Sequence, residues 1–409
     1  MAERTILLKN GRLITDDALI PDSYVLTAGD RIIETGSGSP ELQADLEIDL
    51  QGSIISPGFI DMHTHGILDV DFMSSSYEES EKALKAYTRF GVTRIVATML
   101  SNPIEKIIMQ GKLLGTVRDQ SPVGNIMHGV HVEGPWLAER CRGGHAAQYL
   151  HHPEKGEVRE LLDEIGSIIK SVTYAPELEN AVWLTERLHE RGIVPVFGHT
   201  EATYEQAEAA IKAGARHVTH MYDTTLGYRE NPDEALVMMP GMETAVLYYD
   251  QVSIELIGCP VHVPKPFFKF IAKVKPRDKR IIVTDSLVGT GMPEGTVITY
   301  KDGHQVYVEQ GVLRMIDADP AVHGNLTGSA VTLNTALRRL SEYAELPVEE
   351  AVRWGSYNPA VTLGIEQETG SIKVGKLADI TVMDDDYSIA MTIVKGRILF
   401  DREERYEEV

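Results

Sequence analysis

The feature that most limits the fold of this chain is an alternation of strand and helix patterns that fills its middle. Short apolar runs alternate with longer segments of helical periodicity, which is typical of parallel strands joined by right-handed crossovers. Eight runs are expected to be buried strands: Ile54–His63, Thr93–Thr98, Ile126–Glu133, Ser171–Pro176, Ile193–His199, Arg216–Tyr222, Val252–His262 and Arg280–Asp285. Because eight parallel strands close a barrel, the sequence predicts an α/β fold with a (β/α)8 TIM-like barrel.

Local signals support this division of the chain. Thr203-Tyr-Glu-Gln206 has the capping-box pattern and opens a helix that we expect to stop at Gly214. Both chain ends instead alternate short apolar runs with turn residues, and Asn10-Gly11 and Gly29-Asp30 are predicted hairpin turns. We therefore expect a small β-sandwich domain formed by residues 1–56 and 360–409, and a barrel domain of residues 57–359.

Composition excludes several classes of function. The 409 residues include 39 Lys plus Arg and 61 Asp plus Glu, for a formal net charge of −22, which argues against nucleic acid or an anionic membrane as a partner. With 43% hydrophobic and 24% charged residues, the chain has a globular composition. Two cysteines outside any CxxC pair, no secretory signal pattern and no membrane-spanning apolar stretch favour a reducing, cytoplasmic location.

Polar residues gather where the predicted strands end. The relevant segments are DMHTHG, HVEGP, FGHT, VTHMYD, CPVHV and VTDS. His63 and His65 are two residues apart on a strand, so both side chains point to the same face. Active sites of such barrels lie at the carboxyl ends of the strands, where Glu133, His199 and Asp285 also arrive. Imidazole and carboxylate ligands suit zinc or iron, and a shared carboxylate can bridge two ions.

The motifs resemble those of N-acetylglucosamine-6-phosphate deacetylases, which belong to the amidohydrolase superfamily. The resemblance covers nearly the whole chain and is carried by PGFIDMHTHG, HVEGPW, GHTEATYEQAEAAIKAGARHVTHMY, VTDS, LTGSAVTLNTAL and GSIKVGKLADI. It implies the same barrel and two-ended β-domain. It also implies metal-dependent hydrolysis of N-acetylglucosamine 6-phosphate to glucosamine 6-phosphate and acetate. The implied cofactor is one or two divalent ions, zinc or iron first, with manganese, cobalt or nickel as alternatives.

The resemblance also assigns roles to single residues. It makes Glu133, His199 and His220 ligands of the principal ion, and the presence of His63 and His65 favours a second ion with Glu133 bridging. Asp285 matches the catalytic aspartate and is a further candidate ligand. The matching substrate-binding positions are Arg142, His145, Asp223, Thr224, Arg229 and His262. In the family the arginine at position 229 reaches the phosphate from the neighbouring subunit, which implies a homodimer.

Departures from the family keep other substrates open. Asp223-Thr224-Thr225 stands where the family has Asn-Ala-Met, and Cys259-Pro260 stands where it has Asp-Gly. A carboxylate beside a phosphate is repulsive, so a different N-acyl amino sugar, such as a galactosamine epimer, or another small amide is the alternative substrate. A non-catalytic scaffold is a third hypothesis, against which the complete ligand set speaks. A cyclic-amide hydrolase is disfavoured because SVTYAPE carries no lysine for a carbamylated bridge.

Overall fold

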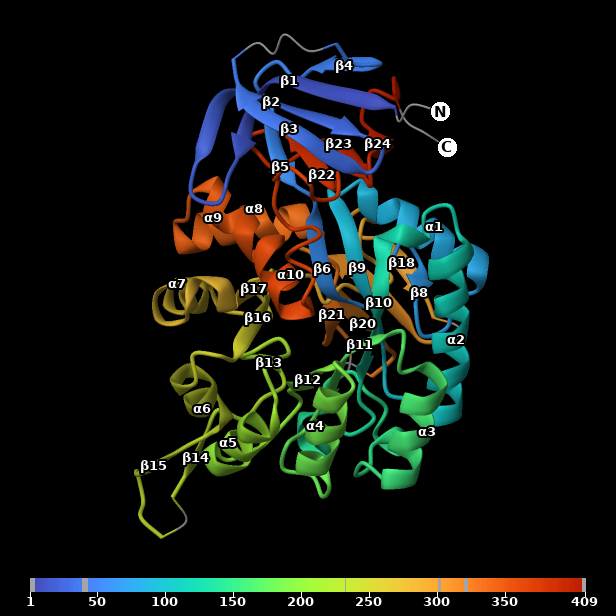
Figure 1. Ribbon diagram of the computed structural model, residues 1–409. Helices are drawn as coiled ribbons and strands as arrows, with labels where there is room; N and C mark the ends of the chain where they lie inside the picture. Colours follow the sequence, from blue (N-terminus) through green and yellow to red (C-terminus); the bar gives the residue numbers. More distant parts are fainter. Residues whose placement is uncertain (1–3, 39–42, 232, 301–302, 320–322, 407–409) are drawn as a thin grey trace.

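The computed structural model describes residues 4–38, 43–231, 233–300, 303–319 and 323–406. A parallel sheet lies in the middle of the molecule with helices around it, and a second sheet that carries both chain ends lies beyond it (Figure 1). Within the described ranges, no helix has the length and apolar character needed to span a membrane.

The central sheet has eight strands in the order β17-β16-β13-β12-β11-β10-β9-β6, and its neighbours pair in parallel. Its strands are β6 (Phe59–Thr64), β9 (Val92–Met99), β10 (Met127–Glu133), β11 (Ile169–Tyr174), β12 (Val194–Phe197), β13 (His217–Val218), β16 (Ser253–Ile257) and β17 (Arg280–Val283). The edge strands also meet: the Asp285 N–H donates to the His63 carbonyl over 2.9 Å, and Thr64 forms a bridge with Ser286. The predicted barrel is confirmed.

Apolar residues explain why these strands are buried and why the helices lie outside them. Every residue of β6, β9 and β16 is buried, as expected for parallel strands covered on both faces. The helices are α1 (Tyr77–Thr88), α2 (Ile104–Gln120), α3 (Lys155–Ile165), α4 (Ala181–Glu190), α5 (Tyr204–Ala213), α6 (Met242–Tyr248), α7 (Lys265–Val274), α8 (Leu333–Ala344), α9 (Val348–Trp354) and α10 (Tyr357–Leu363). The capping box at Thr203 and Gln206 and the helix end at Gly214 are confirmed.

The first predicted strand, 54–63, is wrong as a single element. The chain forms β5 (Ile54–Pro57) in the terminal sheet and β6 in the barrel. The two strands are separated at Gly58, where an added Cβ would lie 2.2 Å from the Thr93 hydroxyl oxygen. Pro57 and Gly58 therefore mark the passage from one sheet to the other, and an apolar run alone does not reveal that break.

The terminal sheet unites the two ends of the chain, as predicted. Its strands are β1 (Thr5–Ile14), β2 (Leu19–Ala28), β3 (Arg31–Ser37), β4 (Leu46–Asp49), β5, β22 (Ile380–Met383), β23 (Ile389–Val394) and β24 (Arg397–Asp401). Hydrogen bonds join all eight into one sheet around a shared apolar cluster. Gly29-Asp30 forms the turn between β2 and β3. The hairpin predicted at Asn10-Gly11 is wrong: β1 continues through it with a register shift, so the pair forms a bulge.

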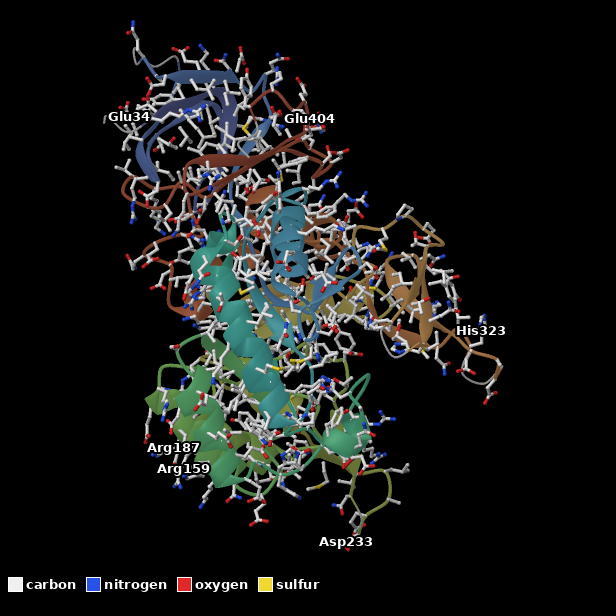
Figure 2. The ribbon with its side chains drawn as sticks, turned by 90° about the vertical axis from the view of Figure 1, so that its right-hand side faces the viewer. Glu34, Arg159, Arg187, Asp233, His323 and Glu404 are labelled. Atoms are coloured by element: carbon white, nitrogen blue, oxygen red, sulfur yellow. The ribbon has the colours of Figure 1, made fainter. Side chains whose placement is uncertain are left out.

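Three smaller sheets were not anticipated from the sequence. A four-stranded antiparallel sheet follows β17, and a hairpin lies between β13 and α6 (Figures 1 and 2). Figure 2 shows His323 and Asp233 at the outer ends of these two projections. Their strands, and those of a short pair after β6, are β18 (Val297–Thr299), β19 (Gln305–Glu309), β20 (Val312–Ile316), β21 (Leu326–Ser329), β14 (Tyr228–Glu230), β15 (Met238–Pro240), β7 (Gly66–Ile67) and β8 (Val70–Asp71).

Candidate active site

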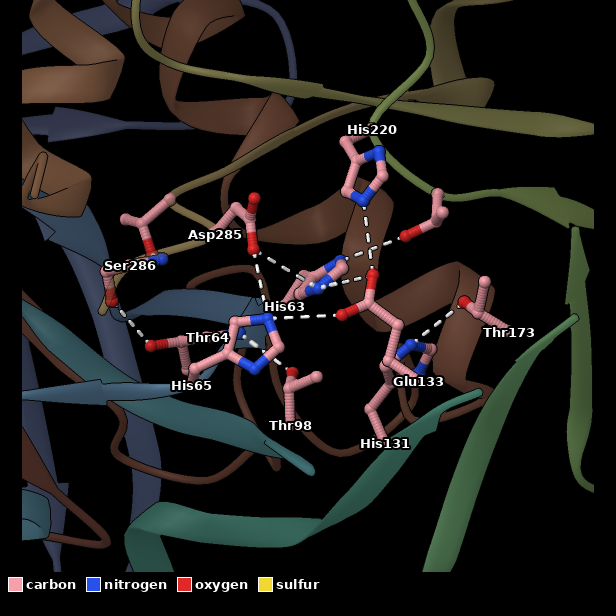
Figure 3. A network of polar contacts seen from close by, with 12 residues as sticks. His63, Thr64, His65, Thr98, His131, Glu133, Thr173, His220, Asp285 and Ser286 are labelled. Atoms are coloured by element: carbon pink, nitrogen blue, oxygen red, sulfur yellow. Dashed lines mark hydrogen bonds and ion pairs between the residues drawn. The ribbon is translucent and has the colours of Figure 1, made fainter. Parts of the chain in front are cut away.

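The six predicted metal ligands converge at the carboxyl ends of the barrel strands. Figure 3 shows side chains from β6, from the end of β10 and from the loops after β13 and β17 around one point. His199 joins them from the segment after β12. His199 and Asp285 both have left-handed backbone conformations, with φ of 47° and 48°. Such conformations are uncommon for residues other than glycine and often occur at functional sites.

Glu133 is the centre of this cluster. It is 1% exposed, and each of its carboxylate oxygens faces ring nitrogens from different strands. Oε1 lies 3.1 Å from His220 Nε2, 3.2 Å from His199 Nε2 and 3.4 Å from His63 Nε2. Oε2 lies 3.2 Å from His65 Nε2. One carboxylate therefore joins histidines from the ends of three strands, β6, β12 and β13, which is the arrangement that a bridging ligand requires.

Asp285 completes one side of the cluster. Its Oδ1 lies 3.1 Å from His65 Nε2 and 3.4 Å from His63 Nε2. The donor atoms of His63, His65 and Asp285 form one compact group, and those of Glu133, His145 and His199 form another. Because Glu133 also contacts His63 and His65, the two groups share a carboxylate.

The pKa values in the cluster are set by two opposing effects: burial disfavours the charged forms, and nearby groups of opposite charge favour them. Burial alone would raise the pKa of Glu133, but His63 and the hydrogen-bonded histidines around it hold that pKa well below its usual range. Burial likewise opposes ionisation of Asp285, yet His63 and His65 lower its pKa to about 2. Burial would lower the pKa of His65, but Asp285 and Glu133 raise it to about 9. Both carboxylates are therefore ionised at neutral pH.

The residues present fit a divalent metal ion. In the described structure, His63 Nε2 is buried, faces Glu133 and Asp285 and has no hydrogen-bond partner, and the Nε2 atoms of His65, His199 and His220 also face Glu133. Buried polar atoms without partners are rare in folded proteins. Imidazole nitrogens grouped with carboxylates match the ligand preferences of zinc and other first-row metals. The cluster can therefore hold a divalent metal ion.

Neighbouring groups fix the orientation of three of the histidines. The Nδ1 atom of His199 lies 2.8 Å from the Cys141 carbonyl, and that of His145 lies 2.7 Å from the Ser101 hydroxyl. The Nδ1 atom of His63 lies 2.6 Å from Glu255, a buried acid of β16. Sequence reasoning missed all three partners. The acidic residue in the apolar run VSIELIG was the available signal for Glu255.

The predicted substrate residues lie in the loops of 142–145 and 223–225, in β14 and in the segment after β16. His145 is buried, with its Nε2 3.3 Å from Glu133 Oε2, whereas Arg142 is exposed and donates to the His145 carbonyl over 2.7 Å. A Cβ at Gly143 would lie 2.9 Å from Thr224 Cγ2, so the loop of 142–145 packs against the loop of 223–225. These loops therefore border the cluster together.

His262 lies in the segment between β16 and α7 and is 8% exposed. Burial alone would lower its pKa, but Cys259, Asp223 and Asp285 raise it above the ordinary value. The imidazole of His262 thus lies close to three groups that can carry negative charge. Arg229 lies in β14, paired with Met239, and its side chain falls outside the described part of the structure.

Comparison with known proteins agrees with this geometry. The model of the amidohydrolase family matches residues 54–399. The chain belongs to the amidohydrolase family. The N-acetylglucosamine-6-phosphate deacetylase of Vibrio furnissii is 30% identical over 347 residues, covering 85% of this chain and 83% of that protein. The N-acetylgalactosamine-6-phosphate deacetylase of Escherichia coli is 26% identical over 396 residues, covering 96% and 99%.

Solved structures of the same family superpose on the whole chain. The N-acetylglucosamine-6-phosphate deacetylase of Pasteurella multocida has 27% identity and a TM-score of 0.85, covering 96% of this chain and 98% of that one. A Mycobacterium smegmatis variant bound to N-acetyl-D-glucosamine-6-phosphate has 28% identity and a TM-score of 0.84, covering 98% and 100%. The family assignment from the sequence motifs is confirmed, and this amidohydrolase is a hydrolytic enzyme for amides.

Proposed function

We propose that this amidohydrolase removes the acetyl group of N-acetylglucosamine 6-phosphate, giving glucosamine 6-phosphate and acetate. The observation that carries the proposal is the buried Glu133, surrounded by histidines from the ends of three strands with Asp285 beside them. Relatives that match over nearly the whole chain carry the name of this activity.

The proposed cofactor is a pair of divalent ions, zinc or iron, that share Glu133. His199 and His220 would hold one ion with Glu133, and His63, His65 and Asp285 would hold the other. When bound, such an ion lowers the pKa of a coordinated water towards neutrality and polarises a carbonyl oxygen. The shared position of Glu133 between two groups of donors supports two ions over one.

The proton transfers are assigned to Asp285. Its carboxylate is ionised at neutral pH, so it can accept the proton of the attacking water and then deliver it to the amine that leaves. His262 lies near both Asp285 and Asp223, which suits it to hydrogen-bond the acetamide oxygen. The loop of 142–145, which packs against Thr224, would then hold the sugar.

A second substrate is supported by a specific residue. Asp223 places a carboxylate in the loop that would border a sugar phosphate, and that charge disfavours a phosphate by Coulomb repulsion. A free N-acetylhexosamine or a galactosamine epimer is the alternative. For the phosphate we propose Arg142 and, from the other subunit of a homodimer, Arg229.

Acetate release from a panel of substrates tests these assignments. The panel contains N-acetylglucosamine and N-acetylgalactosamine, each with and without the 6-phosphate, and metal content is measured on the same sample. We expect the highest kcat/KM for N-acetylglucosamine 6-phosphate. Hydrolysis of the free sugars alone would contradict the phosphate assignment. A metal-free protein without activity on any of the four substrates, even after zinc or iron is added, would favour a scaffold.

A further inference from the structure

Glu255 is a buried carboxylate beneath the predicted metal ligands. It lies on β16, is 2% exposed and is contacted by groups of two other segments, β6 and residues 217–220. Oε1 lies 2.6 Å from His63 Nδ1 and accepts hydrogen bonds from the Thr219 hydroxyl over 2.7 Å and the His220 N–H over 2.9 Å. Oε2 lies 2.9 Å from His217 Nε2. Both oxygens thus have hydrogen-bonding partners within the barrel, and Glu255 does not belong to the groups of donors that could hold an ion.

The first consequence concerns the proton of His63. Because Glu255 Oε1 already accepts hydrogen bonds from the Thr219 hydroxyl and the His220 N–H, the Nδ1 atom of His63, 2.6 Å away, is assigned as a third donor to the same oxygen. The opposite nitrogen, Nε2, is then the one left to bind an ion. It points at Glu133 and Asp285, 3.4 Å from each. Glu255 therefore selects the tautomer in which His63 is a ligand.

The second consequence concerns His220. The same Oε1 atom that orients the ring of His63 also binds the backbone N–H of His220. These two histidines belong to different donor groups, one beside Asp285 and the other beside His199. Oε1 of Glu255 thus contacts one histidine of each donor group. Glu133 also contacts histidines of both groups, through the Nε2 atoms that face the cluster.

The other ligand candidates have weaker supports. The ring of His199 is held by a neutral backbone carbonyl, and the Nδ1 atoms of His65 and His220 lack a hydrogen-bond partner in the described structure. A carboxylate partner raises the basicity of a ligating imidazole more than a carbonyl does. Among the rings described here, His63 is the one that a carboxylate below the centre supports.

We propose that Glu255 is a positioning residue that makes His63 a metal ligand and links the two ion sites. Its negative charge would strengthen binding of the ion beside Asp285. Its hydrogen bond from the His220 N–H would fix the position of His220, a ligand of the other ion, relative to His63. The inference rests on the proposed two-ion centre. His217 acts through Glu255, because its bond holds the carboxylate in place, whereas the Thr219 hydroxyl contacts both Glu255 and, over 3.0 Å, His63 Nδ1.

The test is Glu255→Gln, which keeps the shape of the side chain. The amide oxygen can still accept from His63, Thr219 and His220 while the amide nitrogen faces His217, so the fold is retained and the charge is removed. Metal-free protein is titrated with zinc by calorimetry, in competition with a chelator. Supporting groups of this kind are worth about 10–100-fold in metal affinity. We expect one of the two zinc ions to bind about 10–100-fold more weakly and the other to change less than threefold.

Asp379→Asn is the matched control. Asp379 is also a buried carboxylate, 3% exposed, but it binds Arg94, Thr369 and the Lys395 N–H away from the cluster. We expect this control to lose stability and keep both zinc affinities. Should Glu255→Gln fail to fold, Thr219→Val removes one bond to the same oxygen together with the hydroxyl 3.0 Å from His63 Nδ1, and it is expected to weaken the same ion severalfold.

Three results would overturn the inference. Equal zinc affinities in wild type and in Glu255→Gln would show that the carboxylate does not support His63. Equal losses in Glu255→Gln and Asp379→Asn would indicate a merely structural role, and a wild type with a single zinc site would remove the link between two sites. A wild-type protein that binds no metal would instead contradict the proposed function itself.

Discussion

Replacing Asp285 with asparagine tests the assignment of both proton transfers to one side chain. The position of Asp285 is set by the closure of the barrel, since its N–H donates to the His63 carbonyl over 2.9 Å. In the wild type, Asp285 Oδ1 lies 3.1 Å from His65 Nε2. Asparagine keeps the backbone hydrogen bond to His63 and a side-chain oxygen that can face His65. It cannot accept a proton. The substitution therefore removes the proton acceptor together with the charge that Asp285 would offer an ion, so metal content has to be measured beside activity.

The expected loss follows from the number of steps that the carboxylate serves. A positioned general acid or base contributes roughly 10²–10⁴-fold to a rate. Because Asp285 would act once as a base and once as an acid, we expect kcat to fall near the upper end, by about 10³–10⁴-fold. That fall corresponds to about 4–5 kcal/mol of transition-state stabilisation. KM should change less than about threefold, since the acetamide and sugar contacts remain.

Acetate release and metal content are measured on the same sample of Asp285→Asn. Asp379→Asn, the same change at a buried carboxylate outside the cluster, controls for effects on folding. The reasoning is refuted if Asp285→Asn holds the wild-type amount of metal and retains more than a tenth of wild-type kcat. An equal loss of activity in Asp379→Asn would show that the effect comes from stability.

Two further predictions concern KM after substitutions in the substrate loops, and a third concerns the free energy of unfolding at acidic pH. Asp223→Asn should lower KM for a phosphorylated substrate about 3–10-fold and leave that for the free sugar unchanged, because a repulsive charge is removed; equal KM shifts for both would refute this. Gly143→Ala should raise KM about tenfold at unchanged metal content, because φ is +55° and a Cβ would lie 2.9 Å from Thr224 Cγ2. Burial, with Lys170, Arg94 and Arg118 nearby, lowers the pKa of His128 to about 4. The unfolded chain therefore takes up a proton first as the pH falls below 6.5, and the wild type should lose about 2 kcal/mol of unfolding free energy between pH 7 and 5 that His128→Gln retains. Urea unfolding at the two pH values measures the difference, and parallel curves would contradict the prediction.

The candidate ligands at the ends of the barrel strands were predictable because the same pattern, an apolar run followed by a polar residue, repeats along the sequence. Each barrel strand is an apolar run, and the residue that follows it must emerge at the same rim, so His63, Glu133, His199 and Asp285 could be grouped without any structure. The capping box at Thr203 was equally local. Signals of this kind need only the order of residues and the direction in which parallel strands run.

Features that depend on contacts between distant segments were not predictable. The bulge at Asn10-Gly11 has the residues of a tight turn, yet β1 and β2 pair on both sides of it. Gly58 separates two sheets because Thr93, far along the chain, leaves no room for a side chain. Glu255 looked like a polar residue within a buried strand, and only the fold places it under His63.

The charges inside the barrel are balanced locally and do not follow the net charge of the chain. Neighbouring histidines hold the pKa values of Glu133, Glu255 and Asp285 below their usual ranges despite burial, so three negative charges lie within one barrel. Burying charges costs free energy unless they are paired, and protonated imidazoles or divalent cations can supply the pairing. Binding of the proposed divalent ions would release those protons and supply the positive charge in their place. The net charge of −22 is a sum over the whole chain. An acetamide bound in the site would instead interact with the nearby histidines, carboxylates and the proposed ions.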